Sequence, residues 1–115
     1  MTPHEFAAML FTEKTNLLKA YLRPEGGGVH AAIEALGLGE DKAHELAVLV
    51  DLVLTDSFYT ILLGLDGAAR LGDQMQQGYT ITDENGVVVT EHSDGELEEP
   101  AWEMFQDREL GTLDD

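Results

Sequence analysis

The residues best able to do chemistry in this chain are carboxylates, and they gather in its last third. Residues 73–115 hold 13 acidic residues and one basic residue, Arg108, which gives this part a net charge of −12. Residues 1–72 hold 10 acidic and five basic residues, a net of −5, and the two parts sum to −17. A charge of this size repels nucleic acid and anionic membranes, and it attracts basic surfaces.

These carboxylates predict a protein-binding surface on the segment 94–109, with the turn of a hairpin as a second contributor. On a helix, Glu99, Glu103 and Asp107 recur at four-residue steps and form one acidic ridge, which like-charge repulsion makes unfavourable. Trp102 lies in the same segment, and aromatic residues dominate binding hot spots, although the sequence does not decide between core and interface. The predicted partner-binding residues are Asp83, Glu84, Asp94, Glu96, Glu98, Glu99, Trp102, Glu103, Asp107 and Glu109.

A solvated acidic surface of the halophilic type would carry the same charge without any partner. We favour a basic partner, because lysines interspersed among the carboxylates would have solubilised the surface without the cost of repulsion along the helix.

Other chemistry has less support in the sequence. The four histidines form no HExxH pattern, so no metal or cofactor is predicted. Asp51, Asp56 and Asp66 interrupt an apolar run and could act as an acid or base in a dry site. Asp51 and Asp56 are five residues apart, however, and do not converge on one helix face. We expect Asp51 on the exposed side of an amphipathic helix, Asp56 to cap or bend it, and Asp66 to begin a turn.

Length and composition predict a single domain over residues 1–115, with a loosely ordered end after Leu110. The chain has no cysteine and begins with no signal-peptide pattern, so we expect a cytoplasmic protein. The apolar run Leu46–Leu65 contains two aspartates, each costly within a bilayer, and is therefore interpreted as a core helix.

The predicted fold class is α+β, mostly helical, with three to four helices around a long central helix and one β-hairpin. Thr2-Pro3 predicts a helix start, and Pro24 predicts its end near Arg23. A short helix follows over Val29–Leu36, with Ile33 and Leu36 turned inward. The central helix is expected from Glu40 or Asp41 to Asp66-Gly67. Its inward face should comprise Leu46, Leu49, Val50, Val53 and Leu54, continued by Phe58, Ile61, Leu62 and Leu65.

The period of the sequence then changes from helical to alternating. Asn85-Gly86 between Tyr79–Thr82 and Val87–Thr90 is typical of a hairpin. Regular pairing would place Tyr79, Ile81 and Val88 on one face of it. A last helix is expected around Pro100, with Trp102 and Phe105 forming an apolar patch on an acidic element.

The size, acidity and element layout resemble small acidic immunity proteins of bacterial toxin–immunity systems. The stretches Phe58–Gly67 and Tyr79–Glu84 are similar to segments of small bacterial proteins of that kind. The resemblance implies a non-enzymatic inhibitor of a basic toxin domain, with a nuclease favoured, and transfers no functional residue. A nucleic-acid mimic that blocks a DNA- or RNA-binding protein is the first alternative. A small enzyme using Asp51, Asp56 or Asp66 is the second, and the sequence leaves a homodimer open.

Overall fold

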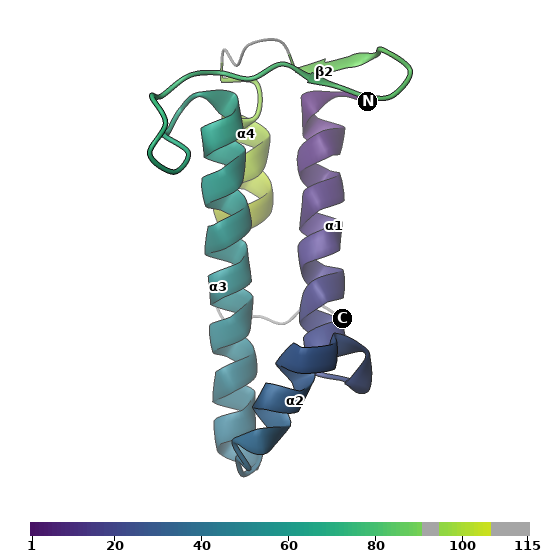
Figure 1. Ribbon diagram of the computed structural model, residues 1–115, viewed down its shortest axis with the longest axis vertical. Coiled ribbons are helices and arrows are strands. Elements are labelled where there is room, and N and C mark those ends of the chain that lie inside the picture. Colours follow the sequence, from purple (N-terminus) through teal and green to yellow (C-terminus); the bar gives the residue numbers. More distant parts are fainter. Residues whose placement is uncertain (91–94, 107–115) are drawn as a thin grey trace.

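The computed structural model describes residues 1–90 and 95–106, and the fold is α+β and mostly helical, as predicted. Two long helices, α1 and α3, lie side by side, α2 joins them at one end, and α4 packs at the other (Figure 1). The hairpin lies over the end of α1 that is nearer to α4. In chain order the elements are α1 (Pro3–Tyr21), the 3₁₀ turn η1 (Pro24–Gly26), α2 (Gly27–Ala35), α3 (Glu40–Asp66), β1 (Ile81–Thr82), β2 (Val88–Thr90), α4 (Glu98–Ala101) and the π-helical turn η2 (Trp102–Gln106).

Helix α1 begins at a capping box, which confirms the start predicted from Thr2-Pro3. The Thr2 hydroxyl accepts the Glu5 N–H at 3.0 Å, and the Glu5 carboxylate accepts the Thr2 N–H at 2.8 Å. The hydrogen bond from the Thr2 backbone is the main reason that the pKa of Glu5 lies below its ordinary value. The helix ends at Tyr21, two residues before the predicted Arg23.

Helix α3 is a single unbroken element, and Gly67 ends it in the left-handed conformation with φ 84°, as predicted. Its polar stretch Thr55–Ser57 causes no break. By length and composition α3 could cross a membrane, a property that it shares with the core helices of soluble proteins.

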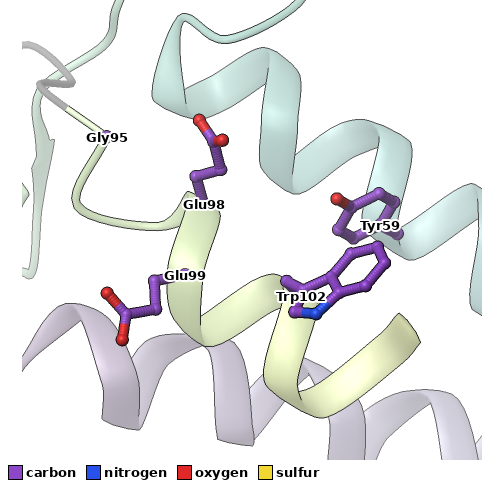
Figure 2. A pocket seen from close by; sticks show the side chains of 5 residues that line it. All are labelled: Tyr59, Gly95, Glu98, Glu99 and Trp102. Carbon is purple, nitrogen blue, oxygen red and sulfur yellow. The ribbon is translucent and has the colours of Figure 1, made fainter. Parts of the chain in front are cut away.

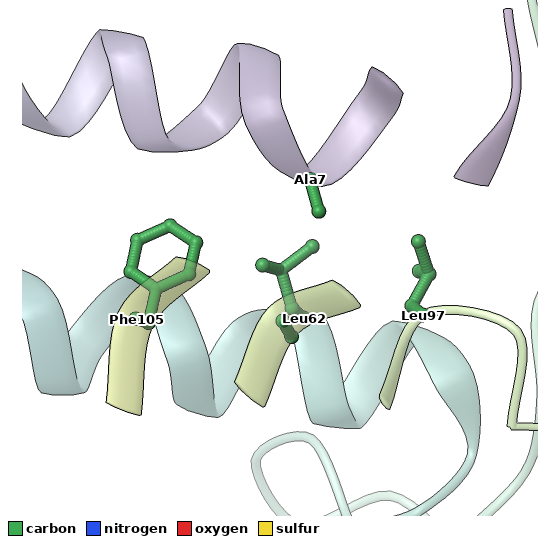
Figure 3. Packing of buried hydrophobic residues seen from close by; sticks show 5 residues of the cluster. Ala7, Leu62, Leu97 and Phe105 are labelled. Atoms are coloured by element: carbon green, nitrogen blue, oxygen red, sulfur yellow. The ribbon is translucent and has the colours of Figure 1, made fainter. Parts of the chain in front are cut away.

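The core lies where α4 and η2 meet the two long helices. It contains Ala7 of α1, Leu62 of α3, and Leu97, Ala101 and Phe105 at the α4 end, all fully buried (Figure 3). The Phe105 ring packs edge-on against Phe11 at 5.3 Å between centroids and stacks on Phe58 at 6.3 Å. The buried side of α4 is therefore fixed by both long helices.

The predicted inward face of α3 is only partly right over its first half, where Leu46, Val50 and Leu54 are half-buried. Leu49 and Val53 are 54% and 55% exposed, whereas Asp51 and Thr55 are buried. We expected Asp51 on the exposed side of the helix, and that prediction is wrong. Residues 46–54 are apolar except for Asp51, so the pattern does not distinguish the faces of α3 there. The buried face is the one whose charge pairs with α1.

Two smaller parts of the α3 and α2 predictions also fail. Ile61 is 50% exposed and Leu36 is 60% exposed, although both were expected to point inward. Asp56 neither caps nor bends α3, since it lies exposed within the continuous helix.

The hairpin forms around the predicted turn, but its register differs from regular pairing. Ile81 pairs with Thr90 and Thr82 with Val88, so Val89 is the extra residue of a β-bulge. The bulge turns Val88 outward and buries Val89 and Thr90, and the prediction that Val88 shares a face with Ile81 is therefore wrong.

The last predicted helix is present in shortened form. Only Glu98–Ala101 is α-helical, and the chain continues as the π-helical turn η2. The expected loose end over 111–115 lies outside the described residues.

Candidate binding groove on α4

An open groove runs along the outer side of α4 and has a volume of about 460 Å³. Tyr59 of α3 and Trp102 form one part of it, and Glu98, Glu99 and Gly95 form the rest (Figure 2). Three of these residues, Glu98, Glu99 and Trp102, were predicted from the sequence to bind a partner. The groove thus joins carboxylates and aromatic rings on one exposed surface.

The aromatic part of the groove is a contact between α3 and the end of α4. The rings of Tyr59 and Trp102 lie 6.4 Å apart between centroids with an interplanar angle of 62°, an edge-to-face arrangement. Tyr59 is partly buried, whereas Trp102 is 53% exposed. Because half of the indole surface remains in water, Trp102 belongs to the surface rather than to the core.

The positions of Glu98, Glu99 and Trp102 follow from what α4 buries. Leu97, Ala101 and Phe105 recur at four-residue steps and all enter the core, with Pro100 buried beside them. Glu98, Glu99 and Trp102 lie between these positions and remain exposed. The Trp102 N–H donates to the carbonyl oxygens of Glu98 and Glu99. Glu98 and Trp102 are therefore one helical turn apart and lie on the same side of α4.

A buried carboxylate holds the start of α4 in place. Asp66, the last residue of α3, is 1% exposed, and its Oδ1 accepts the Leu97 N–H at 2.9 Å. Within the described residues its Oδ2 is buried and accepts no hydrogen bond. Asp66 does end α3 beside a turn, as predicted, and it also ties the groove segment to the long helix.

The groove is strongly negative. Residues 95–106 include four glutamates and no basic residue. In the part of the chain that the structure describes, neither Glu98 nor Glu99 forms an ion pair. The pKa of the Tyr59 hydroxyl is raised, mainly because burial disfavours the anion and secondly because the Glu98 carboxylate repels it. The field of Glu98 thus reaches the aromatic part of the groove.

The other predicted partner-binding residues are distributed as follows. Glu96 and Glu103 are exposed on the same segment as the groove. Glu99 lies in α4 and Glu103 in η2, whose wider turn alters the four-residue ridge that we expected. Predicted residues Asp94, Asp107 and Glu109 lie outside the described residues.

The hairpin turn is separate from the groove. Asp83 and Glu84 are exposed, and the turn that carries them extends past α1 on the side away from α4 (Figure 1). The Asp83 carboxylate also accepts the N–H groups of Asn85 and Val87 at 2.8 and 3.0 Å, so it shapes its own turn. The structure therefore does not bring these two residues together with Glu98 and Trp102.

Asp51 forms a second polar site, halfway along the two long helices. Its Oδ1 accepts a hydrogen bond from the Lys14 ammonium at 2.9 Å and lies 3.5 Å from the Thr55 hydroxyl. Both charged side chains are 2% exposed, and the Lys14 ammonium lies 4.6 Å from the Phe11 ring centroid. A pair buried this fully has no access to a substrate, and it joins α1 to α3.

Sequence reasoning missed Lys14 and Tyr59. Lys14 carried a signal, because it falls between Phe11 and Leu18 on the apolar stripe of α1, where a charge needs a buried partner. No sequence signal pointed to Tyr59, because it lines the groove only where α4 packs beside α3.

Two further cavities lie elsewhere, one of about 530 Å³ beside Met9 and Leu10 and one of about 100 Å³ beside Ile33. Among residues 1–90 and 95–106, no three histidines or carboxylates lie close enough to hold a metal ion. No protein-family model matches the chain, and comparisons with curated proteins and with solved structures found no match either.

Proposed function

We propose that this chain is an acidic binding protein that neutralises a basic protein partner. The partner class that we propose is a bacterial toxin domain of nuclease type, and the chain would then act in the cytoplasm as its immunity protein. The observation that carries the proposal is the half-exposed Trp102 set beside Tyr59 and Glu98 on an acidic surface.

The chemistry of the groove supports this proposal in two ways. Carboxylates without an internal cation attract a basic surface and accelerate its approach, and their effect decreases with salt. An exposed indole adds apolar contact area, and tryptophan is among the residues that dominate binding hot spots. A surface with both carboxylates and an indole can therefore raise the association rate and the affinity for a basic partner.

The residues of the groove and the positions of the three aspartates favour a binding protein over two alternatives, a nucleic-acid mimic and a carboxylate enzyme. A nucleic-acid mimic needs only the charge, because its targets recognise a phosphate backbone. The indole among the carboxylates therefore favours a particular protein partner over a general mimic. The alternative of a carboxylate enzyme is less well supported, because its three candidate residues lie in different environments. Asp51 is buried with Lys14, Asp56 is exposed, and Asp66 accepts a hydrogen bond from Leu97.

The test is capture of the partner with three forms of the protein as bait in a lysate of the source cell. The wild type is compared with Glu98→Lys/Glu99→Lys in the groove. The matched control is Glu25→Lys/Glu34→Lys, which changes the net charge equally near α2, at the other end of the molecule (Figure 1).

The wild type and the control should retain the same basic protein, and the groove variant should lose it. Expression of that protein alone should stop growth, and coexpression with the wild-type chain should restore it. If the groove variant keeps the partner, or if the captured protein is neither basic nor toxic, the proposal is wrong. Capture of many nucleic-acid-binding proteins would instead support the mimic.

A further inference from the structure

We propose that the groove on α4 binds a guanidinium group, stacked on Trp102 and hydrogen-bonded to Glu98. Resting on the proposed function, this inference assigns the bound group to an arginine side chain of the basic partner. It specifies which chemical group the groove recognises, whereas the function above requires only a basic surface.

The groove has the two kinds of surface that a guanidinium needs. The indole of Trp102 offers a half-exposed π face, and tryptophan is the best aromatic partner for a cation. The Glu98 carboxylate lies one helical turn away on the same side of α4, where it could accept two parallel N–H groups. A planar group lying along the groove can therefore meet the ring with its face and the carboxylate with its edge.

The shape of the groove leaves room for such a group. Its volume of about 460 Å³ is open along α4, and the residue at the end opposite the aromatic rings is Gly95, which has no side chain. A Cβ at Gly95 would meet no atom of the described residues within 4 Å, so none of them fills the space there. An arginine side chain can enter over Gly95 and reach the indole.

The electrostatics of the groove favour a cation at its aromatic part. Glu98 has no ion-pair partner within the described residues, and its charge is felt at the Tyr59 hydroxyl. The cation–π contact found in the described part of the chain belongs to Lys14 and Phe11, which lie away from the groove. An external cation would therefore satisfy a charge that is uncompensated within residues 1–90 and 95–106.

Arginine fits this site better than lysine. A guanidinium is planar and weakly hydrated, and it can stack on a ring while it hydrogen-bonds at its edge. An ammonium is compact and strongly hydrated, so it keeps its water in a groove that is open to solvent. A groove that stacks on the bound group and also hydrogen-bonds to it should therefore bind an arginine peptide more tightly than a lysine peptide of the same charge.

Glu98 and Glu99 should contribute unequally. Figure 2 shows the Glu98 carboxylate on the α3 side of α4, the side on which the Tyr59 hydroxyl lies. The Glu99 carboxylate is directed to the other side, toward α1. The two residues are adjacent and carry the same charge, so each serves as the control for the other.

The experiment uses Trp102 as its own reporter, because it is the only tryptophan in the chain. Tetra-arginine and tetra-lysine peptides, which carry equal charge, are titrated into the full-length protein while its tryptophan fluorescence is recorded. The titration is repeated with Glu98→Gln and Glu99→Gln, each of which removes one negative charge. Circular dichroism establishes that both variants remain folded.

Tetra-arginine should change the fluorescence in a saturable way and bind more tightly than tetra-lysine. Glu98→Gln should weaken tetra-arginine binding about tenfold, as expected for loss of a charge-assisted hydrogen bond, and Glu99→Gln by no more than about twofold. Equal affinity for the two peptides, or equal effects of the two variants, would overturn the guanidinium site. If the peptide titration fails, capture of the basic partner still tests the proposed function independently. If capture fails, a measured preference for tetra-arginine still stands.

Discussion

Between α1 and α3, halfway along the molecule, a lysine and an aspartate are buried, whereas at the α4 end a tryptophan is half exposed among glutamates. The two regions thus reverse the usual distribution of charged and aromatic side chains. In the first region each charge has its partner inside the fold, 2.9 Å away. In the second, Glu98 and Glu99 have no ion-pair partner within the described residues.

The difference teaches how to interpret a carboxylate in this chain. Asp51 and Lys14 satisfy one another, so their role ends with joining α1 to α3 in one register. Glu98 and Trp102 retain both charge and apolar surface for another molecule. A charge that is paired inside is structural, and a charge beside an exposed ring is available for binding.

The largest effect is expected from breaking the buried pair. Lys14→Met or Asp51→Leu alone should lower the free energy of unfolding by about 3–5 kcal/mol, because each leaves an uncompensated buried charge. The double variant should recover most of that loss, since two apolar side chains then replace the pair. Urea unfolding followed by circular dichroism measures all three. Single variants that cost under about 1 kcal/mol would show that the pair is not buried in solution.

A second contrast compares two aromatic residues three positions apart. Phe105→Ala should cost about 3–5 kcal/mol of stability, because the ring is fully buried in the core. Trp102→Ala should cost only about 1 kcal/mol, mainly through the lost contact with Tyr59. Urea unfolding of both variants gives the comparison. If the two losses were equal, Trp102 would be a core residue and the groove would not be a binding surface.

Asp66 joins the end of α3 to the start of α4. Asp66→Ala should cost about 2 kcal/mol, because it removes the carboxylate that accepts a buried hydrogen bond from the Leu97 N–H. Asp66→Asn should cost less, since its amide oxygen can still accept that bond. Hydrogen exchange at the Leu97 amide reports the effect locally, and the amide should lose protection in the alanine variant first. Unchanged protection in Asp66→Ala would mean that α4 is held by its apolar face alone.

The smallest effect concerns the ionisation of Tyr59. With Tyr21 and Tyr79 replaced by phenylalanine, ultraviolet absorbance during alkaline titration should give Tyr59 a pKa above the ordinary value of about 10. Glu98→Gln should lower the pKa only in part, because burial is the larger cause and remains. A raised pKa favours the neutral hydroxyl in the folded state. This contribution to stability is present below pH about 10 and is lost as the pH rises through the folded pKa. A Glu98→Gln variant with an unchanged Tyr59 pKa would place the carboxylate away from the ring.

Elements that depend on local chemistry were predictable from the sequence. Thr2 and Glu5 form a capping box around Pro3, and Gly67 ends α3 because a glycine tolerates its left-handed backbone. Asn85-Gly86 placed the hairpin turn for the same reason. Each of these signals acts between neighbours in the chain, so no tertiary information was needed.

Features that depend on packing were not predictable. The bulge at Val89 shifts the strand register, and it buries side chains that regular alternation would expose. The buried face of α3 was partly misassigned in its first half, because apolar residues surround the helix there and the pairing of Asp51 with Lys14 depends on tertiary packing. Of the groove, the carboxylates and Trp102 were predicted from composition, whereas Tyr59 enters through a contact between distant segments.

The most direct test of the claim that the α4 groove is the binding surface is a map of backbone amide chemical shifts during titration with the tetra-arginine peptide. The largest changes should cluster at residue 59 and residues 95–103, with little change at the hairpin turn 83–86 or in α2. Changes spread evenly over the exposed carboxylates, or centred away from α4, would contradict the groove as the site and reduce the acidity to a general surface property.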